Sequence, residues 1–208
     1  MTKSRTCALP LCLALALAAF PGCVADLHQS ADTTASERSA EASRLLGAGV
    51  DAQAHGHFDT AADFYKRSLE LEPTSYVAWH NLGTVLTEQH KYLDAAAALK
   101  RSLEYCADPH DARPYSNLGL VYNNAGFSEQ ALQYYGLALE RDANWIPALR
   151  GTALAARKMN KVDEHLAETM RRALMIETDE KWREIFQGER LRIEGSLREQ
   201  EKARRDGR

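Results

Sequence analysis

The sequence has few cysteines, few prolines and no large excess of charge of either sign. Of its four cysteines, Cys7 and Cys12 lie in the first apolar stretch, which leaves Cys23 and Cys106 in the rest of the chain. Two cysteines are too few for a disulfide framework. The formal net charge is −3 over 208 residues, so nothing attracts nucleic acid to the whole chain and we expect no nucleic-acid partner. Hydrophobic residues make up 45% of the sequence, which is typical of a folded domain.

The sequence also lacks an apolar run long enough to cross a bilayer comfortably. The longest, CALPLCLALALAAF, has 14 residues, whereas a spanning helix needs about 20. It follows a short basic segment with Lys3 and Arg5 and precedes PGC. A basic start, a short apolar core and small residues together predict a secretory signal sequence over 1–22.

Two cleavage sites fit this leader. FPGC at 20–23 resembles the bacterial lipobox, in which the Cys is acylated, although Phe20 and Pro21 depart from its usual residues. The alternative is cleavage after CVA, at Ala25, which would release a soluble periplasmic or secreted protein. We prefer acylation of Cys23, since a Cys directly after Gly at the end of an apolar core is typical of lipoproteins. The expectation is an exported protein, lipid-anchored in the cell envelope and facing the periplasm, with 23–34 as a lipidated tether.

Beyond the leader, three residue types recur together at fixed intervals. The spacing from the first to the second copy is 34 residues and from the second to the third 36. A period near 34 is typical of helix–turn–helix solenoids. The recurring positions are Gly49, Gly83 and Gly119; Ala61, Ala95 and Ala131; and Leu69, Leu103 and Leu139.

Each period contains two stretches with apolar residues at helical spacing, separated by the short turns HGHFD, HKYLD and AGFSE. Trp79 and Gly83 lie on the apolar face of the first helix of the second period. A glycine inside a helix costs about 1 kcal/mol relative to alanine. Its repeated use, opposite a repeated alanine, predicts that the two helices of each period cross closely at these small residues. Upstream, Thr34 and Glu37 predict a capping box that opens the first helix.

These motifs resemble the tetratricopeptide repeat. In the second period the resemblance is carried by Trp79, Leu82, Gly83, Tyr92 and Ala95, and the other two periods match in register. Departures include His90 where Gly usually ends the first turn, and a two-residue insertion near EYCADPHDAR. The resemblance implies an all-α, right-handed solenoid of helical hairpins over 35–180. Its three clear units are about 42–75, 76–111 and 112–145, followed by a degenerate fourth at 146–179 and a C-terminal capping helix with a frayed basic tail at 181–208.

No motif in the sequence predicts catalysis. GAGVDA at 47–52 has the spacing of a dinucleotide-binding loop, but that loop must follow a strand and here it falls within a helical repeat. His55 and His57 lie in a turn without further ligands at metal-binding spacing. Cys106 has no companion base at a recognisable spacing. We therefore expect no enzyme, no cofactor and no metal site.

Function is expected on a second row of each first helix, away from its partner helix. In stacked repeats such rows align on the inner curve and form a groove. Arg113 would offer a fork of donors to a carboxylate, with Leu120 as an apolar contact beside it. The predicted peptide-binding residues are Asn81, Thr84, Glu88, Arg113, Asn117, Leu120 and Asn124.

Some eukaryotic relatives of this family hold a C-terminal carboxylate with a set of Lys, Asn and Arg residues. Asn81 matches that set, and Arg113 matches it in charge. Leu46 and Val50 replace its first Lys and Asn, and Asn117 stands in place of its Arg. The resemblance therefore does not extend to this clamp.

The predicted function is a non-catalytic protein–protein interaction scaffold of the bacterial cell envelope. Its partner would be another envelope protein that places a peptide or helix in the groove, and the lipid anchor would hold the scaffold to a membrane. Three alternatives remain open: a pilotin-like lipoprotein of pilus or secretion assembly, a targeting or regulatory subunit of an envelope enzyme complex, and a structural dimerisation module.

Overall fold

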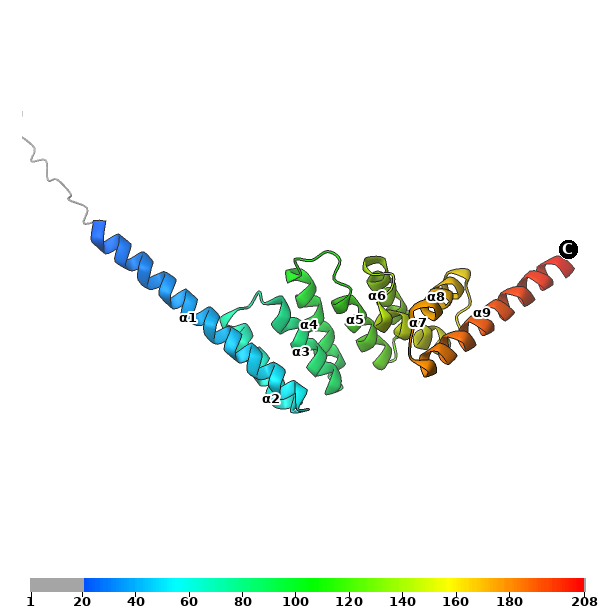
Figure 1. Cartoon of the computed structure of the whole chain (residues 1–208), viewed down its shortest axis with the longest axis horizontal. Helices are drawn as coiled ribbons and strands as arrows, with labels where there is room; N and C mark the ends of the chain where they lie inside the picture. Colours follow the sequence, from blue (N-terminus) through cyan, green and yellow to red (C-terminus); the bar gives the residue numbers. More distant parts are fainter. Residues whose placement is uncertain (1–20, 208) are drawn as a thin grey trace, which may run out of the picture. The chain divides into compact units, whose positions relative to one another are not determined.

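The computed structural model describes residues 21–207 and contains only helices as regular structure in that range (Figure 1). Most of the predicted signal sequence, 1–22, lies outside the described residues. No helix within 21–207 is both long and apolar enough to cross a membrane. The helices are α1 (Pro21–Ala54), α2 (Phe58–Leu71), α3 (Tyr76–Glu88), α4 (Tyr92–Tyr105), α5 (Arg113–Asn124), α6 (Ser128–Arg141), α7 (Ile146–Lys158), α8 (Glu164–Ile176) and α9 (Glu180–Asp206).

The chain divides into two units, 1–37 and 38–208. In the first unit, the described residues belong to α1, which begins at Pro21 and passes Thr34 without a break. The capping box expected at Thr34 is therefore wrong as a helix start, and the segment expected as an extended tether is helical. The physical reason is visible in the sequence, since residues 23–46 contain neither Pro nor Gly to interrupt a helix.

The second unit is a stack of helical pairs in chain order. Residues 38–54 of α1 pair with α2, α3 pairs with α4, α5 with α6 and α7 with α8, and α9 packs on α8 and α7. The predicted fold class is confirmed, including the degenerate fourth pair and the closing helix. The tail expected to fray is instead helical as far as Asp206.

The four turns inside the pairs share one geometry. Gly56, His90, Gly126 and Asn160 have positive φ angles of 75°, 60°, 89° and 49°. The next residue in each turn donates its N–H to a carbonyl five positions back, as in Lys91 N to Leu86 O at 2.9 Å. This is the hydrogen bond of a Schellman ending. His90 thus adopts the conformation that glycine supplies in two of the other turns, which is uncommon but allowed for histidine.

The helices of each pair meet at the recurring glycines. A Cβ atom on Gly49 would lie 2.5 Å from the ring of Tyr65, and one on Gly83 would lie 2.6 Å from Leu99. Gly119 has the same relation to Tyr135, at 2.5 Å. A large side chain from the second helix therefore fills the space left by each glycine. Ala61, Ala95 and Ala131 are fully buried on the second helices.

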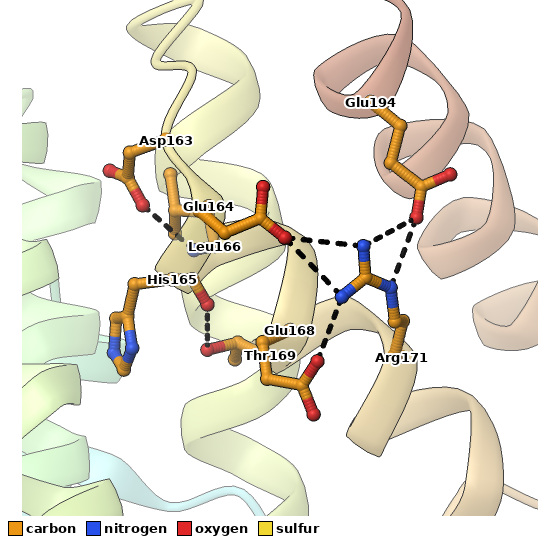
Figure 2. Close-up of polar contacts among 8 residues, drawn as sticks. All are labelled: Asp163, Glu164, His165, Leu166, Glu168, Thr169, Arg171 and Glu194. Carbon is orange, nitrogen blue, oxygen red and sulfur yellow. Dashed lines mark hydrogen bonds and ion pairs between the residues drawn. The ribbon is translucent and has the colours of Figure 1, made fainter. Parts of the chain in front are cut away.

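Ion pairs fasten the closing helix to the last pair. Arg171 of α8 contacts Glu164 and Glu168 of its own helix at 3.4 and 2.9 Å, and reaches Glu194 of α9 at 3.0 Å (Figure 2). Phe186 and Ile193 of α9 are fully buried in the core of the fourth pair. Burying apolar side chains stabilises a fold more than ion pairs at the surface do. This core therefore holds α9 in place, and the ion pairs contribute less to its stability.

Candidate functional site

The first helices of the pairs carry an aligned, largely apolar row. Contacts join α3 to α5 and α5 to α7, so these helices line one side of the solenoid. Val50, Thr84, Leu120 and Leu154 follow one another at spacings of 34, 36 and 34 residues. Val50 is 46% exposed and Leu120 is 41% exposed. Exposed apolar side chains in register are typical of a surface that binds another molecule.

Near α1 and α3, the polar groups beside this row bond to one another. Tyr65 donates its hydroxyl to Gln53 Oε1 at 2.7 Å, and Gln53 Nε2 donates to Thr84 Oγ1 at 3.4 Å. Thr84 in turn donates to the carbonyl of Asn81 at 2.8 Å. Burial raises the pKa of Tyr65 to about 12, with Asn81 acting in the opposite direction. The predicted residues Asn81 and Thr84 therefore belong to an internal polar network.

Arg113, at the start of α5, is already paired. Its Nε and one terminal nitrogen donate to the two carboxylate oxygens of Asp111, each at 2.9 Å, and Asp111 is buried. Tyr76 also donates its hydroxyl to this carboxylate. Burial would raise the pKa of Asp111, but the hydrogen bonds from Arg113 and Tyr76 outweigh it and lower the pKa to about 2. This geometry argues against Arg113 as a receptor for a ligand carboxylate.

His80 and Asn117 connect α3 to α5. The amide nitrogen of Asn117 lies 3.3 Å from His80 Nε2 and can only donate, so Nε2 accepts. Burial lowers the pKa of His80, and the charge of Arg113 acts in the same direction. The imidazole is therefore held neutral, with its other nitrogen, Nδ1, buried without a partner among the described residues. His80 and Asn117 thus link the side chains of α3 and α5.

Beyond Asn117 the surface deepens into a pocket of about 280 Å³. Three predicted residues line it: Asn117, Leu120 and Asn124. Of the other predicted residues, Asn81 and Thr84 lie toward α1, Arg113 is paired with Asp111, and Glu88 is exposed at the end of α3. The full lining is Ser116, Asn117, Leu120, Asn123 and Asn124 of α5, Tyr135 of α6, Pro147, Arg150, Gly151 and Leu154 of α7, and Trp182 of α9.

Arg150 and Trp182 form the far wall of this pocket. Arg150 donates Nε and a terminal nitrogen to the two carboxylate oxygens of Glu177, each at 2.8 Å, and its guanidinium lies 4.9 Å from the centre of the Trp182 ring. Glu177 is buried and also accepts the backbone N–H groups of Thr178 and Asp179 at 3.0 Å. Chiefly through Arg150, and against the effect of burial, its pKa is lowered to about 2. The charge of Arg150 is thus neutralised by the buried carboxylate of Glu177.

Among the lining residues that sequence reasoning missed are Tyr135, Arg150, Leu154 and Trp182. Arg150 and Leu154 repeat the positions of Ser116 and Leu120 at a spacing of 34, so the register could have found them. Trp182 lies on α9, which has no equivalent in the repeats. Within residues 21–207 there is no cluster of three or more His, Cys, Asp or Glu that could hold a metal ion.

Comparison with known proteins agrees with this architecture. Residues 74–144 match the family model described as tetratricopeptide repeat. BBSome complex member BBS4 of Mus musculus is 38% identical over 78 residues, which is 38% of this chain but only 15% of the mouse protein. The segment 74–144 therefore consists of tetratricopeptide repeats, while the chain spans a small part of this relative.

Two solved structures share the fold. MamA from Desulfovibrio magneticus RS-1 superposes with a TM-score of 0.59 at 22% identity, covering 65% of this chain and 75% of that one. The first TPR of Spaghetti (RPAP3), bound to the HSP90 peptide SRMEEVD, has a TM-score of 0.55 at 20% identity and covers 59% and 96%. At these identities the likeness concerns the fold alone.

Proposed function

We propose that this chain is a non-catalytic protein–protein interaction scaffold that binds a peptide or helix of its partner along the first helices of the pairs. The observation that carries the proposal is the aligned apolar row of Val50, Leu120 and Leu154, which ends in the pocket beside Trp182. A repeat solenoid offers an extended surface of this kind to ligands. The tetratricopeptide domain of RPAP3 is itself bound to a peptide, which supports the same class of ligand here.

The distribution of polar groups supports a ligand held mainly by apolar contacts. The acids Asp111 and Glu177 neutralise Arg113 and Arg150, and the amide and hydroxyl groups near α1 bond to one another. A partner would therefore displace water from apolar carbon with little desolvation of unpaired charge. Each Å² of apolar surface buried contributes about 25 cal/mol, so a few anchoring side chains account for most of the affinity.

Affinity capture from envelope extracts with the purified full chain tests the proposal. Leu120→Glu combined with Leu154→Glu should abolish partner capture, because two charges would enter the surface that the ligand must dry. Met175→Glu is the matched control, since Met175 is 82% exposed on α8 and does not line the pocket. Helicity should be retained in all variants. Capture lost with Met175→Glu but retained in the double variant would contradict the assignment of the binding face.

We further propose that the scaffold is exported and anchored through acylation of Cys23, with the solenoid facing the periplasm. The support is the leader itself: Lys3 and Arg5, the 14-residue apolar core and Cys directly after Gly. A single acyl chain anchors a protein only weakly, whereas several acyl chains on one residue anchor it stably. Cys23→Ala should release the chain from the membrane fraction or leave the leader uncleaved. A wild-type chain found in the soluble periplasm with Asp26 as its first residue would refute the anchor and leave the scaffold proposal intact.

A further inference from the structure

Tyr135 is the most deeply buried side chain that lines the pocket and carries a polar tip. Only 2% of it is exposed. Its ring is wedged between two glycines, with Cδ1 next to Gly119 and Cζ next to Gly151. Cζ bears the hydroxyl, and Gly151 and Tyr135 both line the pocket. The hydroxyl end of the ring is therefore directed toward the pocket wall, past a residue that has no side chain to cover it.

The Tyr135 hydroxyl makes no hydrogen bond to any residue that the structure describes. The equivalent hydroxyl in the first pair, that of Tyr65, is bonded to Gln53. In the third pair, the repeat position equivalent to Gln53 is occupied by Asn123, whose side chain is one carbon shorter. The amide oxygen of Asn123 accepts a hydrogen bond from Lys158 at 3.1 Å. Burial also raises the pKa of Tyr135, so the hydroxyl keeps its proton and remains a donor. A hydroxyl that no described residue accepts is free to donate to a ligand.

Arg150, the cation that lines the pocket, is already paired with a carboxylate. Arg150 is bonded through two nitrogens to the carboxylate of Glu177. Lys158, which donates to two neutral oxygens of Asn123, is not among the lining residues. Most of the surface of the remaining wall is apolar, from Leu120, Leu154, Trp182 and Pro147. The polar residues of the wall, Ser116, Asn117, Asn123 and Asn124, carry no charge. A ligand carboxylate here would lose water without gaining a free positive charge, which is unfavourable.

We propose that this pocket is the anchor subsite of the groove, and that it takes one uncharged, apolar side chain of a partner peptide while Tyr135 donates its hydroxyl to a neighbouring peptide carbonyl. This inference rests on the proposed function and gives the ligand its chemistry: an internal or amidated segment, with no terminal carboxylate in the pocket. A volume of about 280 Å³ lies below the range of drug-sized sites, which suits a single side chain with its own backbone.

The smallest probe with these features is N-acetyl-L-leucinamide, which has one apolar side chain and two carbonyls. We would titrate it into the full chain and follow the amide signals of Leu120, Gly151 and Leu154 by NMR. A ligand of this size in a fitting pocket should bind with a Kd on the order of 1 mM. N-acetyl-L-leucine, which has a carboxylate in place of the amide, should bind at least threefold more weakly.

Tyr135→Phe isolates the hydroxyl. It should weaken N-acetyl-L-leucinamide by about 2- to 10-fold, the usual effect of one hydrogen bond. The melting temperature should change little, because no hydrogen bond within the described residues is lost. Tyr65→Phe is the matched control: it breaks the bond to Gln53, so it should lower the melting temperature and leave probe binding unchanged. A hydroxyl with a purely structural role would give the same melting behaviour in both variants.

Three results would overturn the subsite: no perturbation at Leu120, Gly151 and Leu154 at about 20 mM probe, roughly twenty times the expected Kd, equal or tighter binding of N-acetyl-L-leucine, or full affinity in Tyr135→Phe. Partner capture by the groove distinguishes this failure from failure of the proposed function. If capture is still lost in the Leu120→Glu, Leu154→Glu double variant while the probe fails, the groove remains the binding face and only the chemistry assigned to the pocket is wrong.

Discussion

Replacing Gly151 with alanine should destabilise the solenoid, although alanine is the better helix former. Gly151 lies inside α7, where the change to alanine would by itself gain about 1 kcal/mol. An added Cβ, however, would lie 2.1 Å from Cζ of Tyr135, and the ring cannot withdraw because Gly119 holds its other end. Overpacking of this kind costs about 1–3 kcal/mol. Since 1 kcal/mol corresponds to about 2–4 °C in a domain of this size, the cost is measurable by thermal unfolding.

Gly136→Ala is the control for this prediction. Gly136 lies inside α6, and a Cβ there would meet nothing within 4 Å. The gain in helix propensity is common to both variants, so the difference between their melting temperatures isolates the clash. We expect Gly136→Ala to melt about 2–12 °C above Gly151→Ala by circular dichroism. Adding Tyr135→Leu, which removes Cζ, should cancel much of the clash in Gly151→Ala. Equal melting temperatures for the two alanine variants would refute the wedging of Tyr135 between the glycines.

Two further predictions concern stability. Gly83→Leu and Ala131→Leu should each lower the melting temperature, since Gly83 faces Leu99 at close range and Ala131 is fully buried; unchanged melts in both would contradict close crossing of the helices. The pKa of Glu177 is lowered from 4.5 to about 2, so its contribution to stability is present above pH 4.5 and is lost as the pH falls toward 2. Denaturant unfolding of Glu177→Gln should therefore show lower stability at about pH 7 and a weaker pH dependence between 4.5 and 2; an unchanged dependence would argue against this pairing.

The repeat architecture could be predicted from the sequence because each pair obeys the same local constraints. The recurrence of Gly and Ala at 34 and 36 residues fixes where two helices cross, and those crossings fix the stack. The same register locates the left-handed turn residues, including His90 and Asn160, which composition alone would not mark. The start of α1 was not predictable in this way, because a capping motif at Thr34 is only a local preference and an uninterrupted helical sequence overrides it.

The candidate site was harder to predict because it depends on side-chain pairs between segments without repeat equivalents. Arg113 was expected to offer its charge to a ligand. The inserted loop before α5 instead brings Asp111 beside it, and no spacing rule specifies that loop conformation. Trp182 completes the pocket from the closing helix, which the sequence indicates only as a cap. Where a site departs from the repeat, the repeat pattern carries no information about it.

Because of these departures, the two ends of the row of first helices differ in what they offer to a ligand. Near α1 and α3 the polar side chains are joined in a network through Tyr65 and Gln53, and at α5 the charge of Arg113 is neutralised by Asp111. A ligand crossing these parts therefore meets the charge of Arg113 already paired with an acid. Past Leu120 the surface hollows out, and Tyr135 contributes a hydroxyl that no described residue accepts. Affinity should therefore concentrate at the end of the row near α9, and substitutions at Val50 or Thr84 should affect binding less than those at Leu120 or Leu154.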